Sequence, residues 1–262
     1  MIPLSYIRAW SNRVPWINDE QVEQDLVISR SLVEIFSNER LKRNLAFRGG
    51  TALHKLYLNP LPRYSEDIDL VQKVPGPIRV IIDNLRDVLA FIGEPSVTQK
   101  KRNNTLIYRF DSENTTPVTL KLKIEINCRE HFTVLGFKEM KLDVESEWYR
   151  GSAFVETFEL EEILGTKLRA LYQRKKGRDL YDLYKAFILK SPEPEKVLKC
   201  YHEYMMHVVK KGPTGRQFIK NLEEKLKDSE FLGDINYLLL PEEKYDHHAA
   251  YELIRTELIE RM

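Results

Sequence analysis

The sequence is poor in cysteine and lacks any long hydrophobic run. Its two cysteines, Cys128 and Cys200, form neither a CxxC pair nor a Cys/His spacing typical of zinc sites, so we expect no disulfide framework and no structural zinc. No stretch approaches the roughly 18 consecutive apolar residues of a membrane helix, so we expect no membrane association. The N-terminus lacks a basic start followed by an apolar stretch and is not typical of a secretory signal. These absences together indicate a reducing, cytoplasmic setting.

Three catalytic motifs and an excess of one charge are also missing. There is no GxxxxGK[ST] phosphate loop, no GxSxG nucleophile elbow and no HExxH zinc motif, so the corresponding NTPase and hydrolase classes lack support. With 41 Lys and Arg against 40 Asp and Glu, the formal net charge is +1, which does not indicate a bulk nucleic-acid coat protein. Positive charge is instead local, in RLKR at 40–43, QKKR at 99–102 and RKKGR at 174–178.

What is present indicates a folded α+β protein. Hydrophobic residues make up 42% of the 262 residues, enough for one large domain or two modest ones. Apolar spacing predicts helices at 21–41, 51–58 and 77–93, and strands at 45–47, 67–71, 105–110, 119–127 and, more weakly, 131–137. From about residue 159 onward the pattern is helical. This shift predicts an α/β domain over residues 1–155 and a helical domain over residues 156–262.

A glycine turn stands between the strand at 45–47 and the helix that follows it. In FRGGTALHKLY, Gly49 and Gly50 can adopt positive φ and let backbone N–H groups approach a ligand closely. The helix N-terminus near Thr51 adds a partial positive charge, and together these features can cradle a phosphate. Taken alone, a Gly-Gly pair is better explained as a tight turn.

Two aspartates follow in the segment RYSEDIDL. Because residues two apart in a strand point to the same face, we expect Asp67 and Asp69 to lie side by side. Such carboxylates repel unless a proton or a cation lies between them, and Mg²⁺ favours one or two carboxylates plus substrate phosphate oxygens. We prefer this metal site to a solvated strand edge because the glycine turn is so near. Glu125, on the polar face of TLKLKIEIN, is either a third carboxylate at the metal or an ordinary partner of Lys121 or Lys123.

A second charged group lies in LGTKLRALYQRKKGRDLYDLY, residues 164–184. Lys167 lies on a helix whose leucines form a core stripe, while Arg178 and Asp179 begin the next helix, where the helix dipole favours an acid. Lys167 could neutralise a triphosphate, and Asp179 could orient it or accept a proton. Taken alone, the segment is better explained as a salt-bridged helical hairpin.

The order of these pieces resembles the nucleotidyltransferase superfamily and, within it, the AbiEii abortive-infection toxin family of type IV toxin–antitoxin systems. The resemblance covers roughly residues 20–185 and rests on QVEQDLVISRSLVEIF, FRGGTALHKLY, RYSEDIDL and LGTKLRALYQRKKGRDLYDLY, in that order. It implies an α+β fold, with a nucleotidyltransferase-type mixed sheet flanked by helices and then a helical C-terminal domain that completes the active cleft.

The resemblance also implies roles for individual residues. The residues that would bind the nucleotide are Gly49, Gly50, Thr51, Ser65 and Arg178. The residues that would carry out catalysis are Asp67, Asp69, Lys167 and Asp179. The ligands of a catalytic Mg²⁺ or Mn²⁺ would be Asp67 and Asp69, with Glu125 as a candidate third ligand.

The expected activity is magnesium-dependent transfer of a nucleotide from an NTP to RNA, notably the 3′ end of tRNA, by a toxin of a toxin–antitoxin or phage-defence system. An antitoxin encoded alongside would be its partner, and RKKGR with QKKR would guide the RNA backbone. Two alternatives stay open. One is nucleotidyl or phosphoryl transfer to a Tyr or Ser of a protein, and the other is a nucleotide-binding module without catalysis, against which the intact acid pair argues.

Overall fold

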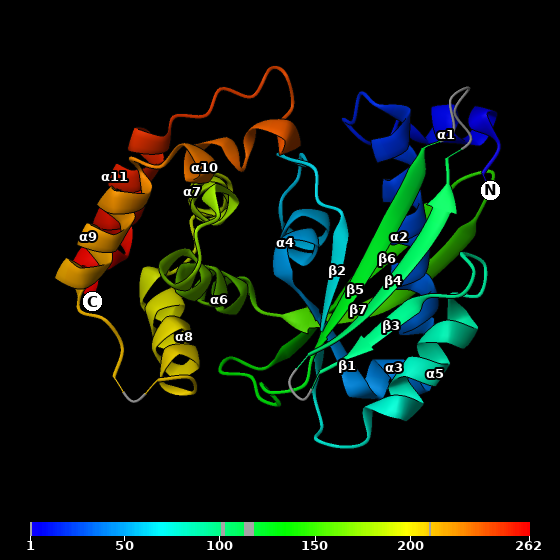
Figure 1. Cartoon of the computed structure of the whole chain (residues 1–262), viewed down its shortest axis with the longest axis horizontal. Coiled ribbons are helices and arrows are strands. Elements are labelled where there is room, and N and C mark those ends of the chain that lie inside the picture. Colours follow the sequence, from blue (N-terminus) through cyan, green and yellow to red (C-terminus); the bar gives the residue numbers. More distant parts are fainter. Residues whose placement is uncertain (1, 101–102, 113–117, 210) are drawn as a thin grey trace. The chain divides into compact units, whose positions relative to one another are not determined.

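Two compact units make up the chain in the computed structural model, which describes residues 2–100, 103–112, 118–209 and 211–262 (Figure 1). The first unit consists of Met1–Leu56, Tyr64–Thr133 and Phe137–Phe158. The second consists of Tyr57–Arg63, Val134–Gly136 and Glu159–Met262. The second unit therefore combines a main body with two short segments from earlier in the chain.

A mixed seven-stranded sheet in the order β3-β4-β5-β2-β1-β7-β6 is the framework of the first unit. The strands are β1 (Leu45–Arg48), β2 (Asp67–Gln72), β3 (Ser96–Gln99), β4 (Asn103–Asp111), β5 (Thr119–Asn127), β6 (Phe137–Glu145) and β7 (Arg150–Phe158). Strand β2 pairs antiparallel with β1 and parallel with β5. The alternation in β5 puts Leu122 and Ile124 in the core, while its charged residues share the other face.

Helices cover this sheet and supply much of the unit's core. Helix α2 (Asp19–Ser37) packs on β5, β6 and β7 and also contacts α1 (Leu4–Trp10), α3 (Glu39–Asn44) and α5 (Ile78–Val88) (Figure 1). The short helix α4 (Gly49–Ala52) instead packs on β2 and β1. It continues directly into the π-helical turn η1 (Leu53–Tyr57), a form that is often found at functional sites.

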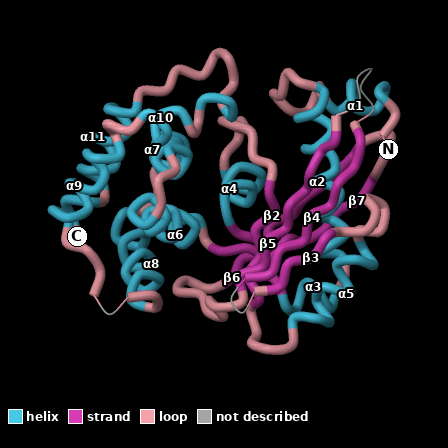
Figure 2. Tube along the Cα trace, viewed as in Figure 1, coloured by secondary structure: helices cyan, strands magenta, loops and turns pink. Residues whose placement is uncertain are grey.

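The second unit is built from helices (Figure 2). They are α6 (Leu160–Gln173), α7 (Gly177–Lys190), α8 (Pro194–Met206), α9 (Gly215–Lys225), α10 (Ser229–Gly233) and α11 (His247–Glu257), with 3-10 turns η2 (Asn236–Leu238) and η3 (Ile259–Arg261). Helix α6 contacts α7, α8 and α9. At Gly165 the approach of α8 is so close that an added Cβ would lie 2.6 Å from Cys200 Cβ. None of the described helices combines the length and apolar character that a bilayer span requires.

The α+β class and the mixed sheet with flanking helices are confirmed, but several boundaries differ from the prediction. The helix predicted over 21–41 breaks at Asn38, whose side-chain oxygen accepts hydrogen bonds from the N–H groups of Arg40 and Leu41 and so starts a new helix. The helix predicted at 51–58 begins earlier, at Gly49, and becomes π-helical.

The weak strand predicted at 131–137 is wrong. The extended segment begins at Phe137 instead, as β6, which forms a hairpin with β7, and β7 was not predicted at all. The sequence of β6, FKEMKLDVE, is largely exposed at the edge of the sheet. An edge strand has little apolar surface to bury and therefore leaves a weak periodic signal.

Candidate active site

The glycine turn and the aspartate strand lie directly against each other. Strand β1 ends at Arg48, and Gly49 follows with φ +87°. A Cβ added at Gly49 would lie 2.1 Å from Asp69 Oδ2. Only glycine both adopts this φ readily and leaves room for the carboxylate. The acid pair thus adjoins the diglycine turn, as the nucleotide–metal interpretation requires.

Strand register gathers three carboxylates on one face of the sheet. In the parallel pairing of β2 with β5, Asp67 lies opposite Lys123 and Asp69 lies opposite Glu125. Adjacent residues on paired strands project to the same side, and so do residues two apart on one strand. Asp67, Asp69 and Glu125 therefore share a face, and the strand of Glu125 lies beside the DIDLV strand, as a role for Glu125 at a metal requires.

A lysine stands among these carboxylates. Lys123 Nζ lies 3.1 Å from Glu125 Oε1 and 3.6 Å from Asp67 Oδ2. Burial raises the pKa of Asp67, and the Lys123 ammonium opposes that shift. Burial acts to lower the pKa of Lys123, but the carboxylates of Asp67 and Glu125 outweigh it and raise that pKa. The alternative partner that the sequence suggested for Glu125 is thus also present.

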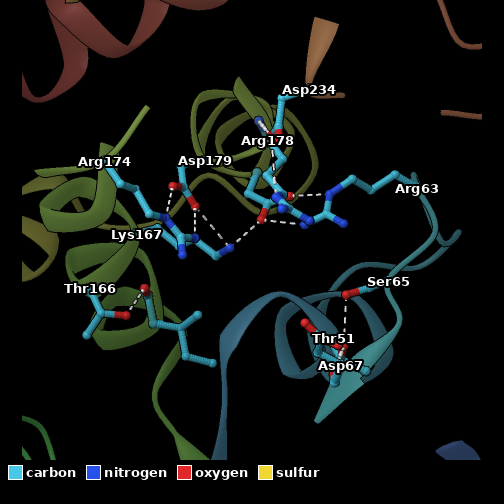
Figure 3. A network of polar contacts seen from close by, with 12 residues as sticks. Thr51, Arg63, Ser65, Asp67, Thr166, Lys167, Arg174, Arg178, Asp179 and Asp234 are labelled. Atoms are coloured by element: carbon cyan, nitrogen blue, oxygen red, sulfur yellow. Dashed lines mark hydrogen bonds and ion pairs between the residues drawn. The ribbon is translucent and has the colours of Figure 1, made fainter. Parts of the chain in front are cut away.

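Hydroxyl groups brace the segment that leads into β2. Thr51 Oγ1 donates a hydrogen bond to the backbone carbonyl of Asp67 and lies 2.8 Å from Ser65 Oγ (Figure 3). Because a threonine hydroxyl has a single proton, Ser65 is the donor in the second bond. Thr51 is buried, so its side chain holds the acid strand against α4 instead of projecting toward a ligand.

Carboxylate oxygens are suitable ligands for a hard divalent cation that is also coordinated by substrate phosphates. Among the described residues, no group of three His, Cys, Asp or Glu side chains is arranged to hold a metal. The pair formed by Asp67 and Asp69 nevertheless offers carboxylate oxygens beside a turn without side chains. Mg²⁺ needs no more protein ligands than this when phosphate oxygens and water complete its shell.

In the second unit, Lys167 and Asp179 belong to a buried ion-pair network. Lys167 Nζ lies 3.4 Å from Asp179 Oδ1 and 2.6 Å from Asp182 Oδ2, and Arg174 donates to both oxygens of Asp179 (Figure 3). Burial acts to raise the pKa of Asp179, but Lys167 and Arg174 outweigh it and hold that pKa below its usual value. The salt-bridged hairpin that the segment alone suggested is therefore present.

Sequence analysis missed Asp182 and Arg63 in this network. Arg63 Nε and Nη2 donate to the two carboxylate oxygens of Asp182 at 2.7 and 2.8 Å. Both side chains are buried. Asp182 lies three positions after Asp179, so the helical period places them on one face of α7. That spacing could have identified Asp182 from the sequence. No local pattern pointed to Arg63, which lies far away along the chain.

The basic cluster RKKGR is paired with acids. Lys175 forms an ion pair with Asp228, and Lys176 lies 3.0 Å from Asp234. Arg178, assigned to nucleotide binding, also contacts Asp234, through its backbone N–H and its guanidinium, both at 3.3 Å. Much of the cluster's charge is therefore offset. The other proposed RNA guide, QKKR at 99–102, lies partly outside the described residues.

A family model and several solved structures are similar to this chain. The family model "Nucleotidyl transferase AbiEii toxin, Type IV TA system" matches residues 30–251. No curated protein matches the chain. JHP933 from Helicobacter pylori is 18% identical, with a TM-score of 0.54 over 94% of this chain and 96% of that chain.

Two further solved structures are similar. A second H. pylori protein, a proposed nucleotidyltransferase, is 18% identical with a TM-score of 0.56 over 94% of this chain and 99% of that chain. The MenT4 nucleotidyltransferase toxin of Mycobacterium tuberculosis is 14% identical with a TM-score of 0.47 over 100% and 98%. The two H. pylori likenesses show a shared fold, and the family match covers most of the chain. The protein therefore belongs to the AbiEii family of nucleotidyltransferase toxins of type IV toxin–antitoxin systems.

Proposed function

We propose that this nucleotidyltransferase transfers a nucleotide from an NTP to RNA, with the 3′ end of tRNA as acceptor, in a reaction that depends on Mg²⁺. The observation that carries the proposal is the contact between the Asp69 carboxylate and the Gly49 turn. It sets metal-binding oxygens beside backbone that no side chain covers. An NTP with its divalent cation requires both: carboxylate oxygens for the metal and open backbone for the phosphates.

Each part of the site has a task. Asp67 and Asp69 hold the divalent cation, with Glu125 as a third candidate ligand. When bound, the metal neutralises charge on the triphosphate and on the departing pyrophosphate. The turn from Gly49 to Thr51 presents backbone N–H groups to phosphate oxygens.

The chemistry needs little beyond position and charge. A ribose hydroxyl oxygen of the RNA attacks the α-phosphorus of the NTP, the bond from that phosphorus to the β-phosphate oxygen breaks, and pyrophosphate leaves. The hydroxyl proton passes to water. We keep Lys167 as a phosphate contact because of its place in the family motif, and Asp179, 3.4 Å from its ammonium, as the group that orients it. Arg178 and Ser65 stay assigned to the nucleotide.

Membership of a type IV toxin–antitoxin family implies an NTP substrate and an antitoxin partner. Which molecule accepts the nucleotide needs a direct test. Incubating the protein with each of the four α-labelled NTPs, Mg²⁺ and total cell RNA and protein separates the candidates. Label in tRNA supports the proposal, whereas label only in protein supports transfer to a Tyr or Ser side chain.

Substitutions at the acid pair test the site itself. Asp67→Asn and Asp69→Asn keep side-chain size and remove the charge that holds the cation. We expect label transfer to fall about 100-fold or more, and EDTA to abolish it in the unaltered protein. Asp83→Asn, on an exposed part of α5, is the matched control and should retain full activity. Unchanged transfer in both acid-pair variants would contradict a catalytic role for the pair. NTP binding without any label transfer, even by the unaltered protein, would support a nucleotide-binding module without catalysis.

A further inference from the structure

Lys123 is a cation on the carboxylate face and contacts two of its acids. Its ammonium lies 3.1 Å from Glu125 and 3.6 Å from Asp67. The two strands create this arrangement, because the β2–β5 register sets Lys123 beside Asp67 and the strand period sets it on the same side as Glu125. Lys123 therefore contacts one carboxylate on its own strand and one on the neighbouring strand.

The position is accessible enough for exchange. The side chains of Lys123, Asp67 and Glu125 are 28%, 35% and 37% exposed. An ion pair with this exposure is weak compared with a buried one, and water can replace either partner. The lysine is thus held at the carboxylates by charge and not locked there by packing.

We propose that Lys123 is a built-in counter-ion that competes with the divalent cation for Asp67 and Glu125, so that metal binding displaces its ammonium. The inference rests on the proposed metal site and adds a residue that sets metal affinity. A +1 group cannot stay close to a divalent cation without strong repulsion. The displaced ammonium, on its flexible stem, is then available to the phosphates that accompany the metal.

The inference explains two observations together. Three carboxylates share one face, yet no group of three ligands among the described residues is ready for a metal. A cation that already binds two of the three accounts for this. It also predicts that the protein without nucleotide binds metal weakly. An NTP should strengthen metal binding, because its phosphates bind the displaced lysine.

The test measures binding of Mn²⁺ alone at pH 8, by electron paramagnetic resonance of the free ion. Lys123→Gln should bind Mn²⁺ about fivefold tighter or more than the unaltered protein, because a nearby positive charge has been removed. Lys123→Arg keeps that charge and should bind like the unaltered protein. Lys121→Gln, on the same face of β5 two residues earlier, is the matched control for loss of a lysine and should also change nothing.

The outcomes separate this inference from the proposed function. If the unaltered protein binds Mn²⁺ and Lys123→Gln binds it within twofold of the same affinity, the counter-ion role is overturned and the metal site stands. If neither protein binds Mn²⁺, with or without a non-hydrolysable NTP analogue, the metal site falls and the inference falls with it. Circular dichroism of each variant checks folding, and Asp67→Asn should bind less Mn²⁺ in both backgrounds.

Discussion

Gly49 meets two demands at one position. Its φ of +87° is a conformation that side chains rarely adopt, and the space beyond its Cα is occupied by the Asp69 carboxylate. The sequence suggested that this glycine opens the backbone to a phosphate. The structure adds that it also makes room for the aspartate, so turn and acid pair depend on each other.

Replacing Gly49 by alanine should therefore damage both stability and activity. We expect a loss of about 1–2 kcal/mol from the positive φ and about 1–3 kcal/mol from the overlap with Asp69, measured by urea unfolding. Label transfer should fall about 100-fold because the carboxylate moves. Gly93→Ala, at φ +114° with nothing within 4 Å of its Cβ, isolates the backbone term and should keep activity. Equal losses in the two variants would contradict the steric argument.

Glu23 on α2 should make stability depend on pH. Burial raises the pKa of Glu23 to about 7 from a usual value near 4.5, with Glu20 and Asp19 adding to the shift. A carboxyl whose pKa is raised on folding favours the native state fully below pH 4.5, and this stabilisation is lost as pH rises through 7. We expect about 2–3 kcal/mol less stability at pH 8 than at pH 4.5 from this group.

The measurement is urea unfolding of the protein and of Glu23→Gln across that pH range. The variant lacks the ionisable group and should have a flatter pH profile and greater stability at pH 8. Glu94→Gln, at a side chain that is 86% exposed, serves as control and should leave the profile unchanged. A Glu23→Gln profile that keeps the full slope would show that other groups cause it.

At the scale of elements, buried charge ties helices and a loop together within the second unit. Asp182 on α7 receives two hydrogen bonds from Arg63, in the segment Tyr57–Arg63, and a third contact from Lys167 on α6. The hydroxyl of Tyr181 donates to the carbonyl of Pro62 at 2.9 Å. The loop that precedes Ser65 and β2 is thus anchored by its own polar groups.

Arg63→Met should be among the most destabilising substitutions in this unit. It leaves Asp182 buried with only part of its hydrogen bonding, which costs about 3–5 kcal/mol for a broken buried pair. Arg79→Met breaks a pair in which Arg79 is 88% exposed and should cost about 0–1 kcal/mol. The double variant Arg63→Met/Asp182→Leu should recover part of the loss, because no orphaned carboxylate remains. Similar stability of the two single variants, measured by urea unfolding, would contradict this account.

At the scale of the whole molecule, charge is nearly balanced. The formal net charge is +1, and the RKKGR cluster is offset by Asp179, Asp228 and Asp234. Sequence alone cannot reveal this pairing, since the acids lie up to 58 positions away along the chain. The RKKGR cluster therefore presents less free positive charge than its sequence suggests.

RNA modification should accordingly depend only mildly on salt. Each phosphate contact to a single strand contributes roughly −0.7 to the slope of log affinity against log salt, and we expect a total slope shallower than about −3. Reversing the charge of Lys175 and Lys176 should weaken RNA modification while NTP binding is kept. A steep slope would contradict the offset of this charge, whereas unchanged activity in the reversed variant would count against a role of RKKGR in guiding RNA.

The sequence by itself determined the local features. Strand β5, the glycine turn after β1 and the same-face pair Asp67 and Asp69 follow from periodicity and turn chemistry, which neighbouring residues specify. The edge strand β6 was not predicted because its residues are mostly exposed and bury little apolar surface.

Only the tertiary structure decided which local features meet. Strand register set Lys123 and Glu125 beside the acid pair, and packing set Asp69 against Gly49. Folding brought Arg63 and Asp182, 119 positions apart, into a buried ion pair. These are contacts between distant segments, and their free energy depends on partners that a local pattern does not contain.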